Sequence, residues 1–181
     1  MTRSDRPRAR RRAAAALLVI ALAAGFAACG YRLRGTGSSL PPGIRTICVP
    51  VFKNQTTRYE IDVKLTQAVI NELVARGKVK ISADPAAADA VLEGEITGFL
   101  ANPIGFSSAN QADSYNVTVT AKVTLRPRAS GPPLFSNPSF IYQQEYEVPP
   151  GSSFESVQTE AIDKIADKFA RSLVVSILEG F

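Results

Sequence analysis

The strongest constraint on the fold is an eleven-residue run, Tyr115–Leu125 (YNVTVTAKVTL), in which apolar or small and polar side chains alternate. Successive side chains of a β-strand point to opposite faces of the sheet. One face of this strand is therefore predicted to be buried and the other to meet water, as is typical of antiparallel sheets. A Pro- and Gly-containing turn at 127–133 follows, and residues 140–148 are predicted to form the hairpin partner.

Two other segments have apolar side chains at the three- and four-residue steps of amphipathic helices. The first is expected to begin at Thr57, because Thr57 and Glu60 have the spacing of a capping box, and to end at Gly77. A second capping box is predicted from Ser152 and Glu155. The helix behind it is expected to reach about Leu178, with an apolar stripe formed by Val157, Ala161, Ile165, Phe169, Leu173 and Ile177.

Three further segments complete the predicted elements. Residues 44–52 and 90–100 are expected to be full strands, and residues 79–82 a short one, whereas 102–113 is predicted to be a polar loop that carries Ile104 and Phe106. This order predicts a single α+β domain over residues 44–181. It would be a two-layer sandwich, in which two amphipathic helices pack on one face of a mainly antiparallel four-stranded sheet.

The N-terminus has the composition of an export signal. Six arginines and one aspartate lie in the first twelve residues, and Ala13–Ala28 is an unbroken run of 16 apolar or small residues. A membrane-spanning helix needs about 20 such residues, so a cleaved signal peptide is predicted. The sequence that precedes Cys29 resembles the bacterial lipobox, in which the cysteine is acylated. An ordinary cleaved signal with an incidental cysteine and a single-pass anchor are the alternatives.

The lipobox interpretation divides the chain into three parts: a signal peptide over 1–28, a flexible Gly/Ser/Pro-rich tether over 29–43, and the domain over 44–181. Two or three acyl chains on Cys29 would hold the protein on a membrane, because each buried methylene contributes about 0.8 kcal/mol. Gly30 follows the cysteine, and by resemblance to lipoprotein sorting in diderm bacteria this favours the outer membrane.

Charge and composition exclude several classes of function. The net charge of +5 comes from the first twelve residues, and the remainder has 15 basic and 15 acidic side chains, so nucleic-acid binding is not predicted. The chain has no histidine, which excludes Ser-His-Asp and Cys-His catalysis and imidazole metal sites. No enzymatic activity, metal or cofactor is predicted, and Cys48 is expected to be a buried apolar residue on a strand.

Paired carboxylates are the remaining candidate groups for general acid–base catalysis. Glu93 and Glu95 share one face of a predicted strand, and Glu145 and Glu147 share a face of another. Glycosidases use two carboxylates across a sugar bond. Alternate acidic residues are also what the solvent side of a half-exposed strand carries, and this is the interpretation adopted.

A group of basic residues is the candidate binding site. Lys122, Arg126 and Arg128 follow the end of the alternating strand into its turn. Lys122 and Arg126 share the polar face with Thr118, Thr120 and Thr124, and such a face could receive the phosphate groups of an anionic amphiphile. The alternative is a solvated hairpin tip. The apolar side chains of Ile104 and Phe106 could likewise dock a partner or fold beneath the sheet.

Several segments together resemble one family, the lipopolysaccharide-assembly lipoproteins called LptE. The similar segments, in order, are Cys29–Gly35 behind the lipobox, 49–56 (VPVFKNQT), 88–94 (ADAVLEG), 115–119 (YNVTV) and 135–138 (FSNP). The similarity of each segment is modest, and it is their common order along the chain that makes the resemblance specific. The Phe-x-Asn-x-Thr pattern at 52–56 also occurs in other outer-membrane lipoproteins, including subunits of the curli-secretion pore.

The resemblance implies a non-enzymatic outer-membrane lipoprotein. Such a protein would lie on the periplasmic side or within the lumen of a large β-barrel, LptD, which it would help to assemble and would plug. It would also bind lipopolysaccharide on its way to the cell surface. The family's basic lipid-binding residues do not map onto this sequence. The assignment of Lys122, Arg126 and Arg128 as a binding site therefore depends only on their charge and on the face of the strand that they occupy. The alternative function is a subunit of an oligomeric outer-membrane secretion pore.

Overall fold

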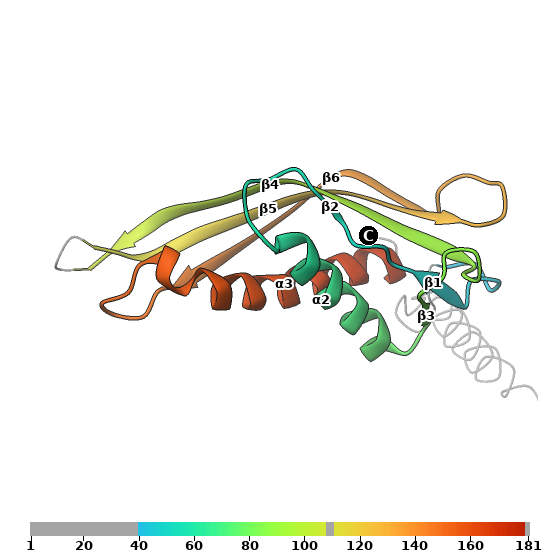
Figure 1. Cartoon of the computed structure of the whole chain (residues 1–181), viewed down its shortest axis with the longest axis horizontal. Coiled ribbons are helices and arrows are strands. Elements are labelled where there is room, and N and C mark those ends of the chain that lie inside the picture. Colours follow the sequence, from blue (N-terminus) through green and yellow to red (C-terminus); the bar gives the residue numbers. More distant parts are fainter. Residues whose placement is uncertain (1–39, 108–110, 180–181) are drawn as a thin grey trace, which may run out of the picture. The chain divides into compact units, whose positions relative to one another are not determined.

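Three long antiparallel strands form most of the sheet in the computed structural model, which describes residues 40–107 and 111–179 (Figure 1). They are β4 (Ala90–Phe106), β5 (Ala112–Pro127) and β6 (Phe135–Glu147). β4 pairs with β5 from Ala90 opposite Pro127 to Phe106 opposite Ala112, and β6 pairs with the other side of β5. The predicted signal peptide, Cys29 and residues 30–39 of the predicted tether lie outside the described residues.

Three short strands extend the sheet beyond β4. They are β1 (Thr46–Cys48), β2 (Lys53–Asn54) and β3 (Lys80–Ser82), and the strand order is β3-β1-β4-β5-β6 with β2 also paired to β4. β1 runs parallel to both β3 and β4, and β2 runs parallel to β4. The α+β class is confirmed, but the four-stranded, mainly antiparallel sheet is wrong, because the sheet is mixed and has six strands.

The difference has two physical causes. A helix, α2 (Ile61–Arg76), lies between β1 and β3 and returns the chain to the sheet in the parallel direction. Of the strand predicted over 44–52, only Thr46–Cys48 forms a strand (β1); Pro50 follows it, and β2 begins beyond the predicted bounds. Proline has no N–H to donate to a ladder, so a continuous strand through this position is disfavoured.

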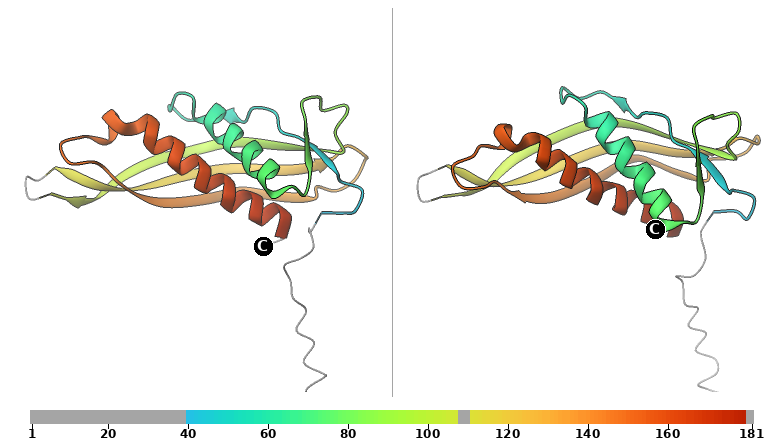
Figure 2. Two further views of the ribbon diagram at one scale, coloured as in Figure 1. Left: turned by 90° about the horizontal axis from the view of Figure 1, so that it is seen from below. Right: turned by 60° about the horizontal axis from the view of Figure 1, so that its bottom comes forward.

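The two helices cover one face of the sheet, as predicted (Figure 2). α2 and α3 (Phe154–Glu179) bury their apolar stripes against the inward side chains of β4, β5 and β6. The inward residues of β5 are fully buried, namely Val117, Val119, Ala121, Val123 and Leu125. Within the described residues, no helix is both long enough and apolar enough to cross a membrane.

The helix starts differ from the predicted capping boxes. α2 begins at Ile61 rather than Thr57, and Glu60 before it is left-handed with φ 57°. The Asn54 side chain organises the intervening turn, because its Oδ1 accepts hydrogen bonds from the Thr56 N–H (2.9 Å) and hydroxyl (2.8 Å). Its amide also donates to the Arg58 carbonyl (2.8 Å). The end of α2 at Gly77 is as predicted.

The start of α3 is one residue later than the predicted box. Ser153 and Ser156 form the reciprocal pair, with the Ser156 N–H 3.3 Å from the Ser153 Oγ and the Ser153 N–H 3.0 Å from the Ser156 Oγ. The Ser152 N–H donates instead to the Pro149 carbonyl (3.0 Å), in the turn that precedes the helix. Ser152 and Glu155 therefore do not cap α3.

The predicted loop at 102–113 belongs largely to strands. β4 continues to Phe106, and β5 begins at Ala112. The pairing has register irregularities around Pro103, Gly105 and Phe106, which accommodate a proline inside a strand. The apolar side chains of Ile104 and Phe106 remain exposed, at 54% and 60%. They do not fold beneath the sheet.

The ring of Phe52 joins the strand edge, the sheet and α2. Its side chain is buried (2% exposed), and its backbone N–H donates to the Thr66 Oγ1 of α2 (2.9 Å). The ring lies directly against Gly94 of β4, where an added Cβ would be 2.5 Å from the ring carbons. Glycine is therefore required at position 94 by close approach rather than by backbone conformation.

We expect Gly94→Ala to lower the free energy of unfolding by about 1–3 kcal/mol, because overpacking a buried aromatic contact forces side chains or backbone to shift. Denaturant titration followed by circular dichroism would measure it. Gly43→Ala is the matched control, since nothing lies within 4 Å of a Cβ at Gly43. Equal stabilities of the two variants would contradict the packing role of Gly94.

Candidate functional site

The outer face of the sheet, opposite the helices, contains a cavity of about 290 Å³. We call it the outer-face cavity. Residues of β4 and β5 form its floor, and the chain between β1 and β2 forms one side. The lining residues are Pro50, Val51, Lys53, Glu93, Gly94, Glu95, Lys122, Thr124 and Arg126.

Cross-strand pairing gives the outer-face cavity an alternating charge pattern. Lys53 of β2 is opposite Glu95 of β4, and Glu95 is opposite Lys122 of β5. An ion pair joins the Arg126 Nε to the Glu93 Oε2 at 3.6 Å. Both of these side chains are largely exposed, so the pair contributes about 0–1 kcal/mol to stability. Three cations thus surround two carboxylates.

Thr124 departs from the predicted alternation. It lies on the polar face of β5 but is 8% exposed, whereas its neighbours Lys122 and Arg126 on that face are exposed. Thr124 is on the floor of the outer-face cavity, beside Pro50 and Val51, and this side of the sheet is therefore not uniformly wet.

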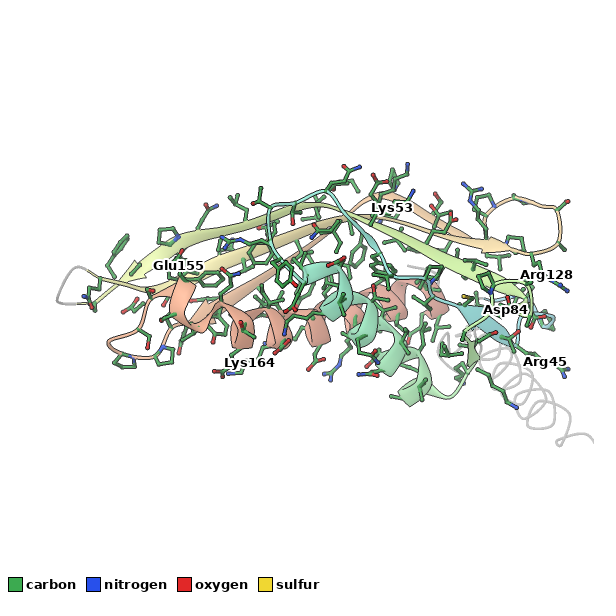
Figure 3. All side chains as sticks on the ribbon, viewed as in Figure 1. Arg45, Lys53, Asp84, Arg128, Glu155 and Lys164 are labelled. Carbon is green, nitrogen blue, oxygen red and sulfur yellow. The ribbon has the colours of Figure 1, made fainter. Side chains whose placement is uncertain are left out.

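Two of the three predicted basic residues line the outer-face cavity, and the third does not. Lys122 and Arg126 are lining residues. Arg128 lies at the end of the sheet near Arg45 and Asp84, apart from Lys53 (Figure 3). Its guanidinium donates to the Ala86 carbonyl (2.8 Å), which ties it to the connection between β3 and β4. Arg128 has a structural contact there and does not join the other two cations.

Lys53 is not among the basic residues that were predicted to form the binding site. Its proximity to Lys122 depends on the parallel pairing of β2 with β4, which joins residues more than forty positions apart. Glu93 and Glu95 were predicted to lie on the solvent side of a half-exposed strand. In the structure Glu93 pairs with Arg126, and Glu95 accepts a hydrogen bond from the Gln55 side chain. No local sequence signal reports these contacts.

The remaining reactive groups are placed as structural residues. Cys48 is buried in β1, as predicted, and burial together with the charge of Asp84 raises the pKa of its thiol. A raised pKa disfavours the nucleophilic thiolate. Glu145 and Glu147 are exposed on β6, opposite Asn116 and Ser114.

Asp89 fastens the end of the sheet beside Arg128. Its Oδ2 accepts hydrogen bonds from the N–H groups of Arg45 (3.0 Å) and Thr46 (2.9 Å) and from the Thr46 hydroxyl (2.7 Å). These bonds, led by that from the Thr46 side chain, lower the pKa of the Asp89 carboxyl, and the charge of Arg128 lowers it further. β1 is thereby held to the start of β4.

The chemistry of the outer-face cavity suits recognition rather than turnover. Lysine and arginine donate charge-assisted hydrogen bonds to phosphate, and carboxylates accept hydrogen bonds from hydroxyl groups. The fold defines a domain of the α+β class.

Comparison with known proteins agrees with this class. A crystal structure of a Xanthomonas campestris protein assigned to the DUF330 family aligns with a TM-score of 0.53 and 12% identity, over 77% of this chain and 90% of that one. A hypothetical protein of Chlamydia trachomatis aligns with a TM-score of 0.50 and 10% identity, over 76% and 97%. At these identities the similarity shows the fold alone. No curated protein sequence matches the chain.

The family model for LptE, described as lipopolysaccharide-assembly, matches residues 44–177. The chain belongs to this family, as its sequence resemblance predicted, and the family is non-enzymatic. Membership supports an outer-membrane lipoprotein that acts in lipopolysaccharide assembly.

The Asp89 network predicts a defined pH dependence. A lowered folded pKa stabilises the protein above the unfolded value of about 3.9, and this contribution is lost as the pH falls through the folded pKa. Asp89→Asn should therefore be less stable than the wild type at pH 7, and the difference should shrink at about pH 3. Urea denaturation at both pH values tests this. A difference that stays constant with pH would contradict the assigned role of the carboxylate.

Proposed function

We propose that this protein is an outer-membrane lipoprotein, anchored through acylated Cys29, that associates with an LptD-type β-barrel. It assists the assembly of the barrel, plugs its lumen, and participates in inserting lipopolysaccharide at the cell surface. The observation that carries the proposal is the family match over residues 44–177. A body with equal numbers of acidic and basic residues after the first twelve suits a polar barrel interior, where matched hydrogen bonds matter more than net charge.

We further propose that the outer-face cavity contacts the lipopolysaccharide head group. Lys122 and Arg126 would take a phosphate group, with Lys53 as a third cation, and Glu93 and Glu95 would accept hydrogen bonds from sugar hydroxyls. Arg128 is not included, because its guanidinium is bonded to the Ala86 carbonyl. The proximity of Lys53, Lys122 and Arg126 around one cavity supports this assignment.

Charge reversal at both positions, Lys122→Glu with Arg126→Glu, should weaken lipopolysaccharide binding at least tenfold, because phosphate would then face four carboxylates. Fluorescence titration with labelled lipopolysaccharide measures the change, and circular dichroism checks the fold. The matched control is Lys78→Glu with Lys80→Glu, which changes the net charge equally at exposed positions outside the cavity. Equal weakening by both pairs would indicate a general charge effect and remove the cavity from the proposal.

The association with a barrel is tested by a mild-detergent pull-down of the acylated protein from outer membranes, with mass spectrometry of the captured proteins. A stoichiometric large β-barrel of the lipopolysaccharide export pathway is the expected partner. A ring of identical subunits would instead support the secretion-pore alternative.

The Cys29→Ala variant should fold but should not be anchored. Mature-length, lipidated material from that variant would contradict the lipobox assignment.

A further inference from the structure

β6 forms one edge of the sheet, and among the described strands only β5 pairs with it. The edge of a sheet presents backbone N–H and C=O groups that can template the addition of another strand. β6 is 13 residues long, and its pairing with β5 is regular from Glu147 to Phe140. The regular part of this edge therefore covers Phe140–Glu147, and Pro138 and a register irregularity precede it.

Side chains identify which backbone groups of β6 point outward. The Asn137 side chain accepts a hydrogen bond from the Ser139 N–H (3.0 Å), and the Gln144 side chain donates to the Glu145 carbonyl (2.8 Å). Residues that direct their backbone groups to the same side of an antiparallel strand alternate along it. Pairing is regular from Phe140 to Glu147, so Gln143 and Ile141, two and four residues before Glu145, also direct their backbone groups to the outer edge. The Ser139 N–H and the Glu145 carbonyl are bonded to side chains, whereas the outward backbone groups of Ile141 and Gln143 between them are accessible to another strand.

The opposite side of the described sheet has features that discourage strand addition, and β3 at the end of the strand order is only three residues long. β4 pairs with β1 and β2 only as far as Ile96, and beyond that point its outer edge contains Pro103 and three register irregularities. Proline and bulges are devices by which natural sheets block edge-to-edge pairing. Between Ser139 and Glu147, β6 has neither proline nor lysine.

A stripe of cations on α3 flanks the helix side of the β6 edge. Lys164, Lys168 and Arg171 follow one another at four- and three-residue steps, and all are exposed. The Lys164 Nζ lies 5.8 Å from the centre of the Tyr146 ring. Phe169 of α3 packs edge-to-face against Tyr142 of β6, with 6.2 Å between the ring centres, which places this turn of the helix beside β6. Burial raises the pKa of Tyr142, and the positive charge of Arg171 opposes that rise.

The two ends of this stripe differ in their pairing. Lys164 forms an ion pair with Glu160 (2.7 Å). Lys168 and Arg171 form no ion pair within residues 40–107 and 111–179, so their charges are available to a partner on this side of the edge.

We propose that the β6 edge accepts an extended strand of a partner protein, which pairs with the backbone of Ile141 and Gln143 and presents carboxylates to Lys168 and Arg171. A second copy of this chain fits poorly, because two-fold pairing through β6 would bring the same cationic stripes toward each other. Main-chain hydrogen bonds would supply affinity, and alternate side chains would supply specificity. The proposal needs neither lipopolysaccharide nor a barrel, and so goes beyond the proposed function.

The test uses the full chain in detergent and two labelled nine-residue peptides, one alternating glutamate with valine and the other lysine with valine. Fluorescence anisotropy should show at least tenfold tighter binding of the glutamate peptide, and this preference should fall at high salt. Equal binding of the two peptides, or no binding of the glutamate peptide, would overturn the proposal.

Two pairs of variants locate the binding. Gln143→Pro removes an outward N–H and should abolish binding, whereas Gln143→Thr keeps that N–H and should bind normally.

Lys168→Glu with Arg171→Glu should remove the preference for the glutamate peptide, and the Lys78→Glu and Lys80→Glu pair should not. The charge reversal keeps the test decisive if the proline variant fails to fold. An unchanged preference in the charge-reversed variant, or a dimer in sedimentation that Gln143→Pro dissociates, would refute the acidic-strand partner.

Discussion

The packing of Phe52 against Gly94 is the contact on which the arrangement of layers depends. It brings the chain between β1 and β2 against β4, and the hydrogen bond from the Phe52 N–H to Thr66 joins the same point to α2. Thr66 also donates to the Asp62 carbonyl (2.6 Å), so its hydroxyl is fully used in a buried position. A side chain at position 94 would separate these three elements at once.

Covering one face of the sheet leaves the other face and the β6 edge open to solvent. The helices bury the apolar side chains of the strands, and the charged row of Lys53, Glu95 and Lys122 lies on the outer face. The same helix that closes the core beneath β6 also carries the exposed cations Lys168 and Arg171. The apolar core and the surface charges thus lie on opposite faces of the same elements, which allows the charges to change with little cost to the core.

Local periodicity predicted the elements better than their boundaries. The alternation in β5 and the apolar stripe of α3 identified both correctly, because each pattern reports a single buried face. The capping boxes were misplaced because Asn54 and Pro149 form local hydrogen bonds that compete with helix initiation. The loop predicted around Pro103 was wrong because bulged pairing with β5 satisfies the backbone there without regular alternation.

The sequence alone determined the α+β class, the lack of histidine chemistry, the neutral body and the resemblance to the LptE family, since these depend on composition, order and short-range pattern. Tertiary structure decided the mixed six-stranded sheet, the presence of Lys53 beside Lys122, and the separation of Arg128 from both. The reason is that parallel pairing and edge exposure arise from contacts between residues tens of positions apart, and no local pattern encodes which strands will meet.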